Sequence, residues 1–105
     1  EQLDYEFLCS GIQIASWEEG LKSPEAQWLD VRESHEMPKL NLENLIEIPL
    51  SEIYDLNQVQ FNSDQVFVYC QSGIRSQKAA VKLKEKFPQK EFISIRGGVN
   101  AYPKN

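Results

Sequence analysis

The chain has 105 residues, of which 41% are hydrophobic and 26% are charged, and its formal net charge is -5. These values are typical of globular proteins, and at this length one hydrophobic core is expected. No apolar run approaches the roughly 20 residues that a membrane helix needs, and the start, Glu1-Gln2-Leu3-Asp4, lacks the basic and apolar regions of a signal peptide. We therefore expect one soluble, cytoplasmic domain that is not embedded in a membrane.

The net charge is unevenly distributed along the chain. Residues 1–69 hold 14 acidic and 3 basic side chains, a balance of -11, whereas residues 70–105 hold 2 acidic and 8 basic ones, a balance of +6. The basic part predicts attraction of an anionic substrate or of an acidic partner surface, although a solvated lysine face explains it equally well. Nucleic acid is a poor candidate, because the whole chain is acidic and no aromatic residues lie between the lysines.

The two cysteines, Cys9 and Cys70, lie far apart in the sequence. In a secreted protein they would be candidates for one disulfide. Nothing here indicates secretion, and the spacing typical of metal ligands is absent. Free thiols and no metal site are therefore expected.

Short apolar runs alternate with segments that have helical spacing. We interpret residues 1–10 as a linker or amino-terminal extension and residues 11–105 as the domain. The run from Ile12 to Ala15 predicts a strand, and Ser16 with Glu19 forms a capping-box pattern that opens a short helix. A buried strand is then predicted over Gln27 to Val31.

The middle of the chain continues the same alternation. Leu45 to Ile48 predicts a strand that Pro49 ends, after which Ser51 is expected to cap a short helix. The run from Gln65 to Tyr69 predicts a central strand that is buried on both faces.

The last third predicts one long helix and one more strand. Ser76 to Phe87 has apolar side chains on one face and lysines opposite, and Pro88 ends it. Phe92 to Ile95 predicts the last strand, and Gly97-Gly98 predicts a turn that allows a close approach of two backbone segments. The whole pattern predicts an α/β fold, a single domain with a mainly parallel central sheet flanked by helices.

Cys70 stands directly after the predicted central strand. Ligands of open α/β sheets bind beyond the carboxyl ends of the strands. The loop that follows leads into a helix, so several backbone N–H groups are expected to converge and stabilise an anion. Together with Arg75 they should favour the thiolate form of Cys70, which is the nucleophilic form, and Gly73 lets the loop curl. A cysteine at the end of a buried strand is often only a small apolar core residue, but the combination of these features favours catalysis.

The stretch from Val66 to Ser76 resembles the active-site segment of single-domain sulfurtransferases of the rhodanese family. Three further motifs agree with it in order. Leu29 to Glu33 resembles the family's early Asp-Val-Arg motif, Ile48 to Leu50 its middle strand end, and Gly97 to Tyr102 its closing double-glycine motif. The resemblance covers about residues 11 to 102.

The resemblance implies that Cys70 takes a sulfane sulfur from a donor and passes it to a nucleophilic acceptor. Thiosulfate and the persulfide of a cysteine desulfurase are the two candidate donors, and no metal or organic cofactor is implied. The backbone amides of the loop would cradle the persulfide; the loop residues are Gln71, Ser72, Gly73, Ile74, Arg75 and Ser76.

The same resemblance places Asp30 near this loop, where a salt bridge to Arg75 would fix the shape of the loop. The alternative for Asp30 is a cap of a helix or turn. Arg32 and Arg96 are candidates to line the entrance to the site, and surface salt bridges explain them equally well.

A narrower resemblance lies at the amino end. Asp4 to Cys9 is similar to the segment that joins an adenylating domain to its carboxyl-terminal rhodanese domain, in proteins that resemble molybdopterin-synthase sulfurylases (adenylyltransferase-sulfurtransferases). This resemblance implies a longer protein that delivers sulfur to the carboxyl-terminal glycine of a small ubiquitin-like carrier protein. Cys9 would then belong to the linker, with a structural role favoured over that of a resolving thiol.

The sequence also departs from the family pattern. Residues 34–44 lack the Gly-His-Ile and Gly-Ala pattern that many members show, so His35 is interpreted as a surface residue. Tyr102 stands where tryptophan is common, and from the end at Asn105 we expect that a terminal helix of the family is missing or has been trimmed.

Two other functions remain open at this point. A cysteine phosphatase also uses a cysteine loop before a helix, but the similar phosphatase loop has five residues between cysteine and arginine, and here there are four. A non-catalytic partner-binding module of the same fold is the second alternative, although such a module would more often have lost the cysteine.

Overall fold

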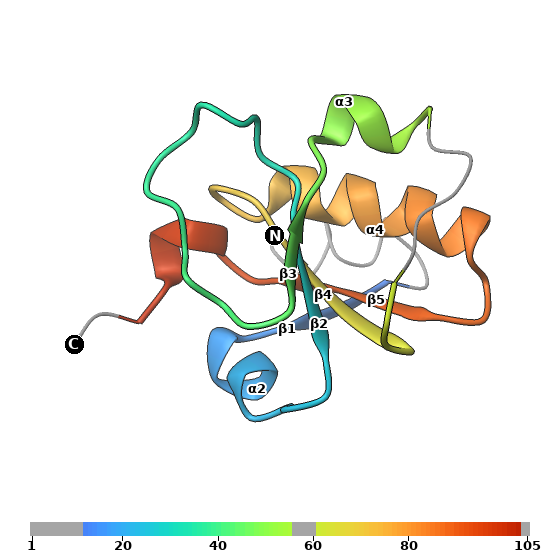
Figure 1. Cartoon of the computed structure of the whole chain (residues 1–105), viewed down its shortest axis with the longest axis horizontal. Coiled ribbons are helices and arrows are strands. Elements are labelled where there is room, and N and C mark those ends of the chain that lie inside the picture. Colours follow the sequence, from blue (N-terminus) through green and yellow to red (C-terminus); the bar gives the residue numbers. More distant parts are fainter. Residues whose placement is uncertain (1–11, 56–60, 104–105) are drawn as a thin grey trace, which may run out of the picture.

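The structure is a computed structural model that describes residues 12–55 and 61–103 (Figure 1). Its centre is a sheet of five strands in the order β1-β5-β4-β2-β3, and every neighbouring pair is parallel. The strands are β1 (Gln13–Ala15), β2 (Gln27–Asp30), β3 (Leu45–Glu47), β4 (Gln65–Tyr69) and β5 (Glu91–Ile95). The predicted parallel α/β fold is therefore confirmed, with β4 at the centre of the sheet.

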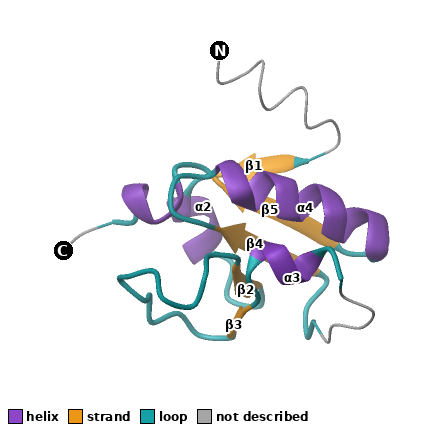
Figure 2. Ribbon diagram, turned by 90° about the horizontal axis from the view of Figure 1, so that it is seen from above, coloured by secondary structure: helices purple, strands orange, loops and turns teal. Residues whose placement is uncertain are grey.

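Among the described residues, helices α2 (Trp17–Leu21), α3 (Leu50–Ile53) and α4 (Ile74–Lys86) connect strands of the sheet, and the 3-10 helix η1 (Gly98–Ala101) follows β5. Figures 1 and 2 show α3 and α4 on one face of the sheet and α2 on the other. Helices on both faces bury the sheet, which is the usual environment of parallel strands.

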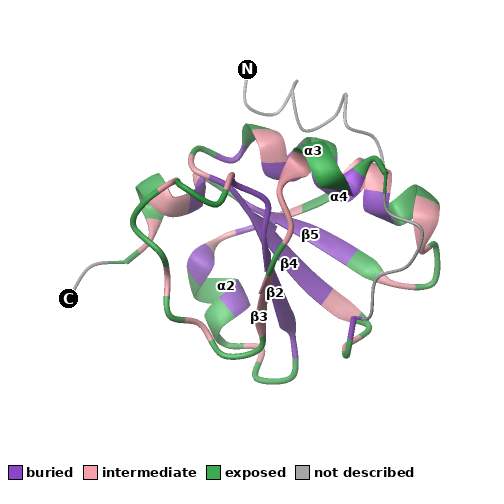
Figure 3. Ribbon diagram, turned by 45° about the horizontal axis from the view of Figure 1, so that its top comes forward, coloured by how far each residue is buried: buried purple, intermediate pink, exposed green. Residues whose placement is uncertain are grey.

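Each face of the sheet has its own hydrophobic core. Val66 and Val68 of β4 point to the face of α3 and α4, where they pack with Leu83. Phe67 and Tyr69 point to the other face, which holds a cluster with Trp17 and Trp28. Figure 3 shows β4 and β5 buried along most of their length, so the central strand contributes to both cores, as the run of apolar residues predicts.

The starts of the helices test the predicted caps. In α2 the capping box is confirmed, because Ser16 Oγ accepts a hydrogen bond from the Glu19 backbone at 3.1 Å and Glu19 Oε1 accepts one from the Ser16 backbone at 2.9 Å. The prediction that Ser51 caps the next helix is wrong. Helix α3 already begins at Leu50 after Pro49, whose fixed φ of -58° leads into the first turn.

Helix α4 begins at Ile74, two residues before the predicted start at Ser76. Gly73 precedes it with a φ of +102°. This left-handed conformation suits glycine and turns the chain sharply into the helix. The active-site loop is therefore shorter than predicted, and Arg75 and Ser76 belong to the first turn of α4.

Within residues 12–55 and 61–103, no helix is long and apolar enough to cross a membrane. In the same ranges, no group of three or more histidine, cysteine, aspartate or glutamate side chains is arranged to hold a metal ion. The segment from Asp4 to Cys9 and the interpreted linker lie outside the described residues.

Candidate active site

Cys70 follows the last residue of β4 and is fully buried, with an exposed fraction of 0%. Its Sγ accepts a hydrogen bond from the backbone N–H of Gly73 at 3.0 Å and a second from that of Ser76 at 3.3 Å. Both donors lie at the start of α4, where the helix dipole is positive and favours negative charge. Two backbone N–H groups therefore converge on the sulfur, and because Cys70 is fully buried, neighbouring groups must move before a reagent reaches it.

Further backbone donors lie on the same loop. In the part of the chain that the structure describes, no protein acceptor binds the N–H groups of Ser72, Ile74 and Arg75. Ser72 is exposed, and the Ile74 side chain is 52% exposed. These amides remain available for an anionic sulfur atom attached to Cys70.

Hydrogen bonds to the Gly73 carbonyl fix the inner side of the loop. This oxygen accepts from Ser76 Oγ and from Gln77 Nε2, both at 3.2 Å. Ser76 Oγ also lies 2.7 Å from Ser94 Oγ on β5. The loop is thus attached to both α4 and the neighbouring strand.

The closing double-glycine segment holds the outer side of the loop. The backbone N–H groups of Val99 and Asn100 donate to the carbonyls of Cys70 and Gln71 at 2.8 and 3.0 Å. A Cβ atom on Gly98 would collide with the Cys70 carbonyl oxygen and lie 2.7 Å from that of Gln71. The predicted close approach at this glycine is confirmed, and Trp17 Nε1 donates to the Gly98 carbonyl at 2.7 Å from α2.

Asp30 and Arg32 form a buried ion pair, each with an exposed fraction of 2%. The Arg32 Nη2 to Asp30 Oδ2 distance is 3.0 Å, and Asp30 Oδ1 accepts from the Arg32 backbone at 2.9 Å. The expected salt bridge between Asp30 and Arg75 is therefore wrong, because Arg32 occupies the carboxylate. The alternative interpretation of Asp30 as the cap of a turn is confirmed by its bond to the backbone of Arg32.

Arg32 does not line an open entrance. Its guanidinium donates to the Pro38 carbonyl at 2.8 Å and to Gln71 Oε1 at 3.2 Å. Gln71 Nε2 in turn donates to Asn100 Oδ1 at 2.7 Å. Arg32 therefore acts as a buried support that connects the end of β2 with the first residue of the Cys70 loop and, through it, with η1.

Arg75 is paired with Glu36, a residue that the sequence analysis did not single out. The two terminal nitrogens of the guanidinium contact the two carboxylate oxygens at 2.6 and 2.9 Å, a bidentate pair. The hydrogen bond from Arg75 lowers the pKa of Glu36 to about 2, and the same bond raises the pKa of Arg75. Glu36 Oε2 also accepts from the Glu33 backbone at 2.9 Å.

A sequence signal for Glu36 existed. The segments that follow β2 and β4 leave the same edge of a parallel sheet, so a carboxylate after β2 is expected near Arg75. Asp30 at the end of β2 and Glu33 and Glu36 after it all lie at that edge. Only the course of the backbone from 33 to 38 decides among them.

Three further residues were interpreted from the sequence, namely His35, Arg96 and Tyr102. His35 and Arg96 are exposed, as the interpretation of His35 requires. Tyr102 is half-buried and packs edge-on against Trp17, with ring centroids 4.7 Å apart. It therefore contributes to the core beneath η1.

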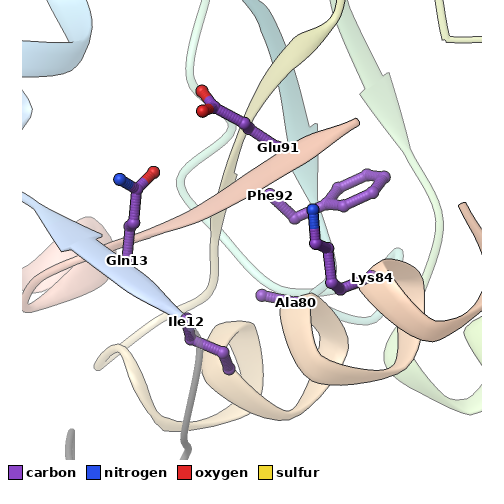
Figure 4. A pocket seen from close by; sticks show the side chains of 6 residues that line it. All are labelled: Ile12, Gln13, Ala80, Lys84, Glu91 and Phe92. Carbon is purple, nitrogen blue, oxygen red and sulfur yellow. The ribbon is translucent and has the colours of Figure 1, made fainter. Parts of the chain in front are cut away.

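A shallow pocket of about 210 Å³ lies between β1, β5 and α4 (Figure 4). None of the residues lining it belongs to the Cys70 loop, and none was a candidate site residue in the sequence; they are Ile12, Gln13, Ala80, Lys84, Glu91 and Phe92. Lys84 Nζ donates to the carbonyls of Pro88 and Lys90, both at 3.0 Å. The lining residues include no cysteine, serine, threonine or histidine, and the amine of Lys84 is engaged by two carbonyls, so the candidate active site remains the Cys70 loop.

The fold and the site together define a class of protein, a parallel α/β domain with a buried cysteine held by backbone amides at the carboxyl edge of its sheet. Comparison with known families is more specific. Residues 14–105 match the rhodanese-like domain model, so the chain belongs to the rhodanese-like domain family.

Two relatives of known name are similar to this chain in sequence. The adenylyltransferase and sulfurtransferase MOCS3 of Drosophila grimshawi is 31% identical over 98 residues, 87% of this chain and 22% of that protein. YrkF of Bacillus subtilis, provisionally named as a sulfur carrier protein, is 30% identical over 87 residues, 82% of this chain and 47% of that protein. The chain thus spans less than half of either relative's length, and it belongs with a family of sulfurtransferases.

Solved structures agree on the fold. The rhodanese homologue TT1651 of Thermus thermophilus superimposes with a TM-score of 0.70 at 25% identity, and the match covers 85% of this chain and 99% of that one. The five-stranded parallel sheet with flanking helices is therefore the rhodanese fold.

Proposed function

We propose that the chain is a sulfurtransferase that carries a sulfane sulfur as a persulfide on Cys70. The observation that supports this most strongly is the pair of backbone N–H groups, from Gly73 and Ser76, directed at Cys70 Sγ. Such donors stabilise a sulfur anion both before and after loading. The amides of Ser72, Ile74 and Arg75 are further donors for the outer sulfur.

The reaction consists of two displacements on sulfur. The Cys70 thiolate attacks the sulfane sulfur of the donor, a new sulfur–sulfur bond forms, and the old bond breaks with its electron pair leaving on the rest of the donor. With thiosulfate the leaving group is sulfite, and with a persulfide it is a thiolate. An acceptor then attacks the outer sulfur of Cys70 and restores the thiolate. The roles of Cys70 and of loop residues 71–76 in these steps are part of the proposal.

The test is to load the chain with sulfur and locate it. After incubation with thiosulfate or with a small-molecule hydropersulfide, intact mass should rise by one sulfur atom, and peptide analysis should place it on Cys70. Added cyanide should release thiocyanate and restore the original mass. Cys70→Ser should accept no sulfur and release no thiocyanate. The proposal is overturned if neither donor loads the chain, or if Cys70→Ser behaves like the parent.

A cysteine phosphatase would need Arg75 to bind the oxygens of phosphate. Here both terminal nitrogens of Arg75 contact Glu36, and only four residues separate Arg75 from Cys70. We therefore expect negligible hydrolysis of an aryl phosphate. A robust rate that disappears in Cys70→Ser would favour the phosphatase instead.

A partner protein is the finer part of the proposal. One relative is named as both an adenylyltransferase and a sulfurtransferase. We infer that residues 1–10 are a linker, that residues 11–105 form the domain, and that an adenylating domain lies elsewhere in the full-length protein. The acceptor would be a small ubiquitin-like carrier that ends in two glycines. Pull-down of such a carrier by the full-length protein is the expected result, and no retention would remove this part of the proposal while leaving the chemistry of Cys70 intact.

A further inference from the structure

Arg75 is the charged side chain among residues 71–76, and its positive charge is already paired with a carboxylate. Glu36 contacts both terminal nitrogens of the guanidinium at 2.6 and 2.9 Å. The backbone N–H of Glu33 holds Glu36 in place at 2.9 Å. The pair is partly exposed, with 34% of the Arg75 side chain and 21% of the Glu36 side chain accessible, so it lies at the rim of the site.

Arg32, the other arginine near the loop, is matched as well. It is buried and paired with Asp30 at 3.0 Å, it also donates to Pro38 and Gln71, and its guanidinium lies 5.8 Å from the centroid of the Tyr69 ring. Each arginine thus has its own carboxylate. The charges of these two arginines are therefore each matched by an acidic residue, Asp30 at the end of β2 and Glu36 after it.

The pairing of both arginines with carboxylates should affect the reactivity of anionic and less charged sulfur donors differently. Thiosulfate is a dianion at neutral pH, so its reaction with a thiolate brings three negative charges together. A thiol persulfide brings one negative charge at most on its reacting sulfur. Coulombic repulsion scales with the product of the charges, and an arginine engaged by a carboxylate compensates less of it than a free arginine.

We propose that Glu36 is a specificity-determining residue that, by occupying Arg75, selects thiol persulfides over thiosulfate as the sulfur donor. This inference rests on the proposed function, since it assumes that Cys70 accepts sulfur. Glu36 acts through Arg75 and touches no reacting atom.

The preferred first step is balanced as follows. Cys70–S⁻ and R–S–SH give Cys70–S–SH and R–S⁻: the bond to the outer sulfur breaks, its electron pair leaves with the thiolate R–S⁻, and the proton stays on the outer sulfur. The corresponding step with thiosulfate gives Cys70–S–S⁻ and sulfite. No oxidant or reductant is needed in either step.

Glu36→Gln tests the proposal, because it removes the negative charge and keeps the shape of the side chain. Thiocyanate formation with cyanide is followed for two donors, thiosulfate and an alkyl hydropersulfide whose only ionisable group is its S–SH group. In Glu36→Gln the kcat/KM for thiosulfate should rise about tenfold, as one uncovered charge near the donor would produce, and it should fall steeply with added salt. The kcat/KM for the hydropersulfide should change less than about threefold.

Two variants separate selectivity from a general effect. In Glu36→Gln with Arg75→Gln, the gain for thiosulfate should disappear, because the uncovered cation is gone. Glu25→Gln removes the same charge from an exposed residue that lines a different pocket, and it should leave both kcat/KM values unchanged.

The outcomes are distinguishable. Equal loss or no change of kcat/KM for both donors in Glu36→Gln overturns the role of Glu36, even when Cys70 still forms a persulfide. A gain for thiosulfate that persists without Arg75 also overturns it. Failure of Cys70 to accept sulfur from either donor overturns the proposed function itself.

Discussion

At the scale of single residues, the pairing of charges decides how the site is held together. Asp30, at the end of β2, forms an ion pair with Arg32, and Glu36, in the segment after β2, forms an ion pair with Arg75. The first pair is buried and supports Gln71, and the second is partly exposed and ties the loop to residues 33–38. Removing one partner of the buried Asp30–Arg32 pair leaves an uncompensated buried charge, which is strongly destabilising. The partly exposed Glu36–Arg75 pair contributes less to the free energy of unfolding.

The Glu36–Arg75 pair makes a prediction about pH. The pKa of Glu36 is lowered from its ordinary value of 4.5 to about 2, chiefly by the hydrogen bond from Arg75. A lowered pKa means that the pair stabilises the fold above pH 4.5 and that this contribution is lost as the pH falls toward 2. Because the pair is partly exposed, we expect a contribution of about 1 kcal/mol.

Urea unfolding of the parent chain and of Glu36→Gln at several pH values measures this contribution. The free energies of unfolding should differ most at neutral pH and converge as the pH falls from 4.5 toward 2. Glu25→Gln serves as the control for a change of net charge. A difference that stays constant over this range would contradict the assignment.

At the scale of elements, η1 holds the Cys70 loop in position through backbone hydrogen bonds. Val99 and Asn100 donate to the carbonyls of Cys70 and Gln71, and Gly98 lies too close to Cys70 to carry a side chain. This contact joins the end of the chain to the turn between β4 and α4. The closing motif therefore determines the shape of the site although it supplies no reactive group.

Gly98→Ala should disturb the contact between η1 and the Cys70 loop. The added Cβ would collide with the Cys70 carbonyl and push the loop away, and displacement of a reacting atom lowers rates by about tenfold to a hundredfold. Gly97→Ala is a matched control, because Gly97 also has a positive φ, of +79°, but its Cβ would meet Ala101 and not the loop.

Both glycine variants should lose stability through backbone strain, by about 1–3 kcal/mol. Only Gly98→Ala should also lose most of the rate of sulfur loading on Cys70. Equal loading rates in the two variants would show that the contact of Gly98 with the loop does not matter for the reaction.

At the scale of the whole molecule, the sheet couples two cores. Leu83 of α4 packs on one face, whereas Trp17 and Trp28 stack on the other, with ring centroids 5.3 Å apart. Strand β4 separates them and contributes to both. We therefore expect the two faces to unfold together as one cooperative unit.

Leu83→Ala tests this coupling. The side chain is fully buried, so its truncation should cost about 2–5 kcal/mol. Tryptophan fluorescence, which reports on the opposite face, should shift to the same lower urea midpoint as far-UV circular dichroism. Lys78→Ala, exposed on the same helix, should change the stability by less than about 0.5 kcal/mol. Separate midpoints for the two signals would contradict a single unit.

Most of the fold could be predicted because it depends on nearby residues. The apolar run from Gln65 to Tyr69, the helical spacing up to Phe87 and the capping box at Ser16 each act within a few positions of the chain. The predicted starts of α3 and α4 were wrong, and the reason is also local. Pro49 and Gly73 set the backbone there, and their effect outweighs that of the hydroxyl residues Ser51 and Ser76.

The sequence by itself determined the family, the strand-loop-helix unit around Cys70 and the close approach of Gly98, because ordered motifs and glycine conformations are local properties. Only the tertiary structure decided that Asp30 pairs with Arg32 and Glu36 with Arg75. Several carboxylates follow β2, all at the edge where the loop after β4 lies. Which of them meets an arginine depends on distances across the sheet, and spacing along the chain does not encode those distances.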